Sequence, residues 1–191
     1  MTHRLLQHCD PAGRRRVILA SAERAVFLRD SETTLDLART AIAAGRTLLE
    51  EAQARAGDEQ VDLSAALDAG QLLAAIDHPD PARLMLAGTG LTHLGSASGR
   101  DAMHKAAQAG AQTDSMRMFL EGVEGGKPAP GQDGAQPEWF YKGDGQMLVH
   151  PEAPLHMPAF AQDGGEEPEL AGIYLIGDDG TPFRLGVALG N

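Results

Sequence analysis

One stretch of the chain, Pro137 to Glu169, constrains what the rest can form more than any other. It ends in a Glu-Pro-Glu sequence directly before the apolar run Leu170 to Ile176. Pro168 lacks an N–H and pushes the preceding residue out of the α region, so this point is a strand entrance or a sheet edge. Alternate residues of an extended chain project to the same side, which would aim the carboxylates of Glu167 and Glu169 into one space.

Two neighbouring carboxylates repel each other unless a cation lies between them. Hard oxygen ligands suit Mg²⁺, or another divalent cation such as Mn²⁺ or Ca²⁺, and Mg²⁺ leaves positions for substrate oxygens. The alternative is a solvated acidic turn before a strand, because Glu-x-Glu is a common pattern. Lys142 follows the aromatic residues Trp139, Phe140 and Tyr141, so a cation also lies in this stretch.

The composition excludes several classes of protein. The chain of 191 residues is 42% hydrophobic and 23% charged, which is typical of a soluble, globular protein. Its net charge of −11 argues against a nucleic-acid partner, because neutralising phosphates requires a basic face. The single cysteine, Cys9, fits a reducing compartment, and no apolar run approaches the length of a membrane span. We therefore expect a cytoplasmic protein with no membrane partner.

The first 80 residues predict a small subdomain of strands and helices. Apolar residues at helical spacing predict one continuous helix, with Ser31 or Asp30 as its N-cap and Gly57 as its C-terminal stop. The sequence His78-Pro79-Asp80-Pro81 then marks the boundary of the subdomain. The strands expected before the helix are Arg4 to Cys9, Arg14 to Ala20 and Ala25 to Leu28.

Residues 81–191 predict a second domain with an exposed loop at 122–137, where Gly, Pro, Gln and Asp dominate. A buried strand at Arg83 to Ala87 is expected to run into Gly88, which permits a sharp turn or the close approach of a ligand. His93 lies just beyond, either as a hydrogen-bonded loop residue or as a catalytic one. The other expected elements are helices at Asp101 to Ala111 and Ser115 to Glu121, a strand at Gln146 to Val149, and a hairpin of Leu170 to Ile176 with Phe183 to Leu189.

The run from Pro137 to Gly190 resembles the core of the fumarylacetoacetate hydrolase superfamily, through Phe140-Tyr141-Lys142 and Glu167-Pro168-Glu169. Gly88 to Ser96 and Asp114 to Phe119 are similar to its GguC-like branch, which contains 2-keto-3-deoxypentonate dehydratases. The resemblance implies an α+β fold, in which a small N-terminal α/β subdomain at 1–80 precedes the beginning of a mixed β-roll in a catalytic domain at 81–191.

The resemblance also implies a function, the Mg²⁺-dependent enolisation and dehydration of a 2-keto-3-deoxy sugar acid to 2-oxoglutarate semialdehyde in pentose catabolism. Glu167 and Glu169 would hold the metal. Lys142 would neutralise the substrate carboxylate or enolate, or support the glutamates, and a Schiff base on this lysine is a weaker alternative. His93 would be catalytic, although its surroundings are out of register with the family pattern.

Two other functions stay open at this point. One is hydrolysis of a C–C bond in a 2,4-diketo acid, the reaction for which the superfamily is named. The other is an inactive fragment or a remnant that binds a sugar acid, because proteins of this kind continue beyond the position of Asn191 and carry a third acidic ligand there. The resemblance further implies that the full-length protein is a homodimer acting on a small-molecule 2-keto acid.

Overall fold

The structure is a computed structural model that describes residues 2–90, 105, 114–135, 138–162 and 168–191. The described part belongs to the α+β class, as the sequence predicts, and its strand pairs are antiparallel. The chain divides into two compact units, one formed by Met1–Pro81 with Met147–Asn191 and the other by Ala82–Gln146. The catalytic domain expected at 81–191 and its mixed β-roll stay predictions.

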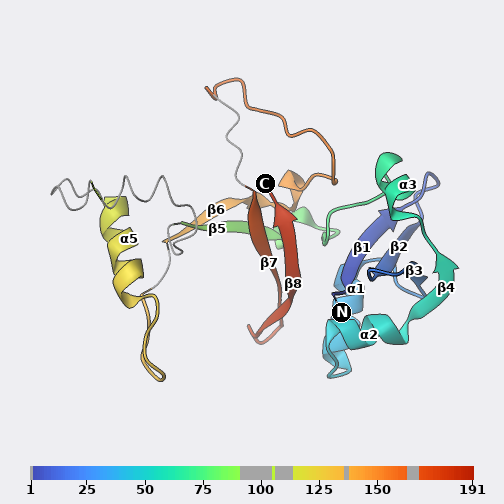
Figure 1. The fold of residues 1–191 in the computed structure, drawn as a ribbon, viewed down its shortest axis with the longest axis horizontal. Helices are drawn as coiled ribbons and strands as arrows, with labels where there is room; N and C mark the ends of the chain where they lie inside the picture. The colour runs from blue at the N-terminus through green and yellow to red at the C-terminus, as the bar shows by residue number, and fades with distance from the viewer. Residues whose placement is uncertain (1, 91–104, 106–113, 136–137, 163–167) are drawn as a thin grey trace. The chain divides into compact units, whose positions relative to one another are not determined.

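The N-terminal residues form a four-stranded sheet in which the strands follow one another in chain order (Figure 1). A tight turn joins the first two strands: the Asp10 carboxylate accepts hydrogen bonds from the N–H groups of Ala12 and Arg14, and Gly13 takes a φ of +82°. The three expected strands are therefore confirmed. The strands are β1 (Arg4–Cys9), β2 (Arg15–Ala20), β3 (Ala25–Leu28) and β4 (Ala56–Gln60).

The core of this part lies on both faces of the sheet. Val17 and Leu19 of β2 pack with Leu37 and Ala52 on one face, whereas Ile18 of β2 belongs to a cluster on the other. Burial on both faces explains why the last four residues of β2 form an uninterrupted apolar run without alternation. The second cluster consists of Ile18, Ala20, Ala25, Phe27, Ala66 and Leu72.

The single helix expected from Ser31 to Gly57 is wrong, because the chain forms α1 (Thr34–Ala43) and α2 (Leu48–Ala54). Gly45 adopts a φ of +65°, and its N–H and that of Arg46 bond back to the carbonyls of Ile42 and Ala41. This pattern is a Schellman motif, which ends a helix.

The second helix starts immediately afterwards with a capping box. The Thr47 hydroxyl accepts from the Glu50 N–H, and the Glu50 carboxylate accepts from the Thr47 N–H. Thr33 is the N-cap of α1 in place of Ser31, and Gly57 lies in β4 and not at a helix end.

The chain after β4 returns along the free edge of β1. The short helix α3 (Leu63–Asp68) begins with the Asp62 side chain as its cap. The next segment then pairs with β1, since Cys9 N–H donates to the Gln71 carbonyl and Leu73 N–H donates to the Gln7 carbonyl. A short 3-10 helix, η1 (Pro81–Arg83), follows.

The unit Ala82–Gln146 contains a two-stranded ribbon of β5 (Met85–Gly90) and β6 (Glu138–Asp144), and the helix α5 (Asp114–Gly125). The expected burial of the strand at 83–87 is wrong, because Met85 is 63% exposed. The expected strand at 146–149 is also wrong. Its start belongs to a 3-10 turn, η2 (Gly145–Met147), in which the Asp144 carboxylate accepts from the Gln146 N–H.

Helix α5 confirms the helix expected at 115–121 and extends to Gly125, so that among the described residues of 122–137 the expected exposed loop is confined to 126–135. The helix expected at 101–111 lies outside the described residues, apart from Lys105, which is helical.

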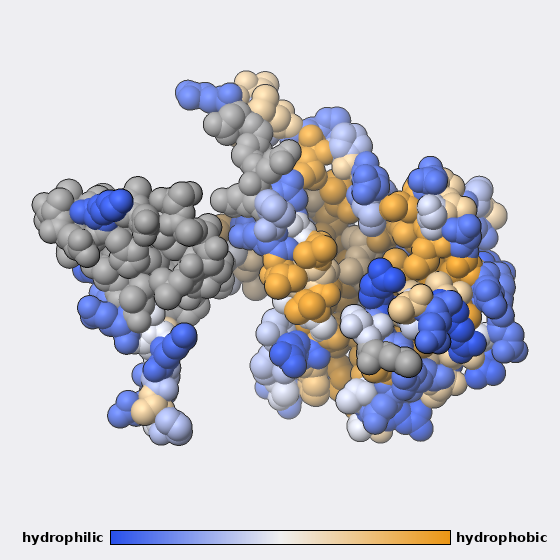
Figure 2. Space-filling view, in the orientation of Figure 1, coloured by the Kyte–Doolittle hydropathy of each residue, from blue (hydrophilic) through white to orange (hydrophobic). Residues whose placement is uncertain are grey.

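The hairpin of β7 (Glu169–Ile176) and β8 (Pro182–Gly190) confirms the expected pair of strands. Its turn is held by Asp179, whose carboxylate accepts from both the N–H and the hydroxyl of Thr181, and by Gly180 at a φ of +84°. Figure 2 shows hydrophobic surface over this hairpin. Its exposed apolar side chains are Leu170, Tyr174, Ile176, Val187 and Leu189. Among the residues that the structure describes, no helix is long and apolar enough to cross a membrane.

Replacement of Gly45 tests the helix break. We expect Gly45→Ala to lower the free energy of unfolding by about 1–2 kcal/mol, because a Cβ is strained at positive φ even where the space around it is open. Gly45→Asn is the matched control and should cost less, since asparagine tolerates this conformation. Urea unfolding followed by circular dichroism measures both. Equal stability of Gly45→Ala and the wild type would contradict the assigned break.

Candidate functional site

Two of the four predicted site residues lie in the described part of the chain. Lys142 is on β6, and Glu169 is the first residue of β7, paired with Gly190. Both residues are exposed. His93 and Glu167 lie outside the described residues, so the convergence of Glu167 and Glu169 stays a prediction. Lys142 and Glu169 belong to different units of the chain, and their proximity stays a prediction as well.

The surroundings of Lys142 are built by the β5–β6 ribbon. Gly88 of β5 pairs with Phe140 of β6, and the register shifts by one residue between Ala87 and Leu86. Ala87 pairs with Tyr141 and Leu86 with Gly143, so Lys142 is the extra residue of a β-bulge. The Lys142 Nζ atom lies over the Phe140 ring, 5.6 Å from its centroid, near the outer limit of a cation–π contact.

The backbone at the predicted ligand Glu169 has the extended conformation that the sequence predicts. β7 begins at this residue directly after Pro168, which agrees with the extended conformation that a proline at this place favours. Among the described residues, no group of three or more His, Cys, Asp or Glu side chains is arranged to hold a metal ion. Glu169 is the one predicted ligand whose backbone the structure describes.

A polar cluster that the sequence did not indicate surrounds Gln7, which is fully buried in β1. Its Oε1 accepts from the Thr34 N–H and from Arg15, and its Nε2 donates to the Ala74 carbonyl and to Asp77. Arg15 also forms an ion pair of 2.8 Å with Asp77. Burial favours a higher pKa of Asp77, but the hydrogen bonds from Arg15 and Gln7 outweigh it, so the pKa lies below the ordinary 3.8. Each of these residues bonds to another member of the cluster, which is typical of a structural network, although Arg15 Nε and Thr34 Oγ1 are buried without a hydrogen bond among the described residues.

A second cluster surrounds Glu51 of α2, whose side chain is only 6% exposed. Its carboxylate binds Arg55 at 2.7 Å and Arg46 at 3.1 Å, and Arg55 also donates to the Asp30 carbonyl. The hydrogen bond from Arg55, opposed by burial and aided by Arg46, holds the pKa of Glu51 below its ordinary 4.5. These contacts fasten α2 to the residues that precede and follow it. They leave no unpaired charge that would suggest catalysis.

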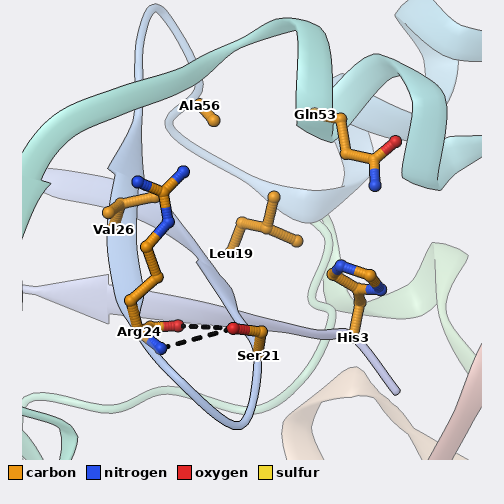
Figure 3. Close-up of a pocket in the computed structure, with 7 residues that line it drawn as sticks. All are labelled: His3, Leu19, Ser21, Arg24, Val26, Gln53 and Ala56. Carbon is orange, nitrogen blue, oxygen red and sulfur yellow. Dashed lines mark hydrogen bonds between the residues drawn. The ribbon is translucent and has the colours of Figure 1, made fainter. Parts of the chain in front are cut away.

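A surface hollow of about 220 Å³ lies between strands of the N-terminal sheet and α2 (Figure 3). Its apolar walls are formed by Leu19, Val26 and Ala56. The Ser21 hydroxyl forms hydrogen bonds with the backbone of Arg24 in a turn. The remaining lining residues are His3, Arg24 and Gln53. No motif could have indicated these residues, because only the strand register brings them together. We assign no chemistry to this hollow, since its lining holds no acid to pair with His3.

No protein-family model, curated protein or solved structure matches the chain. The described residues give the local structure at two of the predicted site residues, Lys142 beside Phe140 and Gly88, and Glu169 at the entrance of β7.

The buried Glu51 cluster yields a pH-dependent prediction. We expect Glu51→Gln to destabilise the fold at pH 7, because the amide leaves Arg46 and Arg55 without their buried anion. The folded pKa of Glu51 is lowered, so its contribution is complete above about pH 4.5 and is lost as the pH falls through the folded value. The stability difference between variant and wild type should therefore shrink below pH 4.5.

Thermal unfolding measured from pH 3 to pH 7 tests this expectation. Glu32→Gln removes an exposed carboxylate that precedes α1 and serves as the control, with little expected change. A difference between Glu51→Gln and wild type that is the same at every pH would show that the carboxylate charge is irrelevant.

Proposed function

We propose that this chain takes part in the metal-dependent dehydration of a 2-keto-3-deoxypentonate, as a protein of the fumarylacetoacetate hydrolase type. The observation that carries the proposal is the order of Phe140-Tyr141-Lys142, the Glu167-Pro168-Glu169 sequence and a hairpin along one chain. The described geometry is compatible with it, since Lys142 lies on a strand and Glu169 opens the first strand of the hairpin. A cytoplasmic homodimer acting on a small 2-keto acid belongs to the same proposal.

Glu167 and Glu169 are the residues that would hold the cation. Glu169 is exposed at a strand entrance and supplies a carboxylate, the hard oxygen donor that Mg²⁺ and the related ions Mn²⁺ and Ca²⁺ accept. Glu167 is the second proposed ligand because the family resemblance implies it. In an extended Glu-Pro-Glu sequence its side chain would also project to the same side as that of Glu169. A bound cation would polarise the keto group of the substrate and lower the free energy of its enolate.

Lys142 has the role of binding the substrate carboxylate through its ammonium group. A charge-assisted hydrogen bond of this kind is stronger than a neutral one and fixes the substrate in one orientation. The neighbouring Phe140 ring restricts where the ammonium can lie. His93 is the proposed group for moving a proton to or from the substrate, because histidine titrates nearest to neutral pH.

Removal of either glutamate tests the metal site. We expect Glu167→Gln and Glu169→Gln each to weaken Mg²⁺ binding by about tenfold or more, because even outer partners of metal ligands contribute roughly 10–100-fold. Glu166→Gln removes the same charge from the adjacent position and should change the affinity little. Calorimetric titration with Mg²⁺, repeated with Mn²⁺, measures the three variants. Equal losses in all three would indicate non-specific attraction of a cation to an acidic turn.

The reaction itself is tested with Mg²⁺ and a 2-keto-3-deoxypentonate. We expect formation of 2-oxoglutarate semialdehyde, and a fall in kcat/KM of about 10²–10³ in Lys142→Met, the range for removing one stabilising donor. Lys127→Met changes an exposed loop lysine and is the matched control. Turnover of an acylpyruvate in place of the pentonate would favour C–C bond hydrolysis, and binding without turnover would favour a sugar-acid-binding protein. Each of these results would contradict the proposed dehydration.

A further inference from the structure

Gly88 occupies an unusual place beneath two side chains of the neighbouring strand. It is a buried residue within β5, at neither a turn nor a chain reversal. A Cβ added there would lie 2.6 Å from Cε2 of Phe140 and 2.8 Å from Cε of Lys142. Real Cβ atoms essentially never approach other heavy atoms so closely. The ring and the lysine stem therefore fill the volume that any other side chain would need.

The β-bulge explains how both side chains reach the same glycine. Phe140 is directly opposite Gly88 in the register. In a regular ladder Lys142 would lie opposite Leu86, but the register shift places Gly143 opposite Leu86 and Tyr141 opposite Ala87, so Lys142 is the extra residue of β6. A bulge bends its strand and redirects the side chain it carries. Here the Cε atom of Lys142 comes to lie over Gly88, next to the Phe140 ring.

We propose that Gly88 and Phe140 are positioning residues for Lys142. Glycine at 88 lets the aromatic ring and the lysine stem lie across β5, and the ring holds the ammonium on one side of the ribbon. The ring face attracts a cation, and at an exposed site this contact contributes about 0.5–1 kcal/mol. The consequence for catalysis rests on the proposed function, whereas the placement of Lys142 does not.

Nuclear magnetic resonance tests the placement without any substrate. The chain contains only three lysines, Lys105, Lys127 and Lys142, so lysine labelled with ¹³C gives a small set of resonances. Lys142→Arg assigns the signal of interest by removing it. In the wild type we expect the Hε resonances of Lys142 to be shifted from those of Lys127 by the ring current of Phe140. Coincident Lys142 and Lys127 resonances in the wild type would overturn the proposal.

Gly88→Ala is the critical variant, and we expect it to abolish the ring-current shift because the new methyl displaces the ring and the lysine stem. Gly186→Ala is the matched control. Gly186 also lies in a two-stranded ribbon beside a register shift, has no positive φ, and has open space where its Cβ would lie. Persistence of the Lys142 shift in Gly88→Ala, or its loss in Gly186→Ala, would overturn the proposal.

A double variant covers the case in which Gly88→Ala disturbs the ribbon as a whole. Gly88→Ala with Phe140→Leu gives the methyl room, so we expect native fluorescence of the single tryptophan, Trp139, without the ring-current shift. A shift retained in the double variant would show that Phe140 is not its source and would contradict the proposal.

Kinetics separate this inference from the proposed function. In the active protein, Gly88→Ala should lower kcat/KM about 10–100-fold, since a displacement of about 1 Å at a reacting centre can cost 10²-fold. If the chain has no dehydratase activity, the proposed function fails and the resonance experiment still decides the placement of Lys142. If the activity exists and Gly88→Ala retains full kcat/KM, the positioning role fails and the dehydratase stands.

Discussion

The N-terminal part of the structure depends on the burial of β2 on both faces. Because Val17 to Ala20 are all buried, the chain must cover each face of the sheet with apolar side chains. A straight helix from Thr34 to Ala54 would be about 30 Å long at 1.5 Å per residue, against about 20 Å for a strand of six residues such as β2. Much of it would extend past the sheet. The break at Gly45 solves this mismatch, since α1 and α2 each contribute a residue, Leu37 and Ala52, to the same cluster.

Two-sided burial has a second consequence, because it encloses polar groups that then require partners. Gln7 would leave an amide unsatisfied in the interior if Thr34, Arg15, Ala74 and Asp77 did not bond to it. These bonds fix the start of α1, the strand β2 and the segment after α3 to one side chain of β1. The lowered pKa of Asp77 is a result of this arrangement. Perturbed carboxyl groups are common at catalytic sites, yet here the perturbation is explained by the fold alone.

Sequence patterns correctly predicted the elements whose structure is determined by residues close together in the chain. Turn chemistry at Gly13 and Gly180 and the apolar runs beside them were sufficient for the strands and the hairpin. The break at Gly45 was missed because a glycine in an alanine-rich stripe resembles a small core residue, and its role depends on hydrogen bonds to Ile42 and Ala41. The extended start of β7 followed from Pro168, but the bulge at Lys142 is set by pairing with β5 more than 50 residues earlier. No periodicity within β6 contains that information.

The candidate site likewise combines features set by neighbouring residues in the chain with features set by strand pairing. Lys142 and Glu169 both lie on two-stranded ribbons, a type of structure that is marginally stable by itself in water. Neither residue is held by a core like the clusters around β2, and both are exposed. Short-range features act on both residues. Glu169 pairs with Gly190 at the start of β7, and Lys142 is placed by the bulge together with the missing side chain at Gly88. A site of this construction is therefore sensitive even to a residue that carries no functional group, because an alanine at Gly88 changes no charge and yet occupies the space on which the position of the ammonium depends.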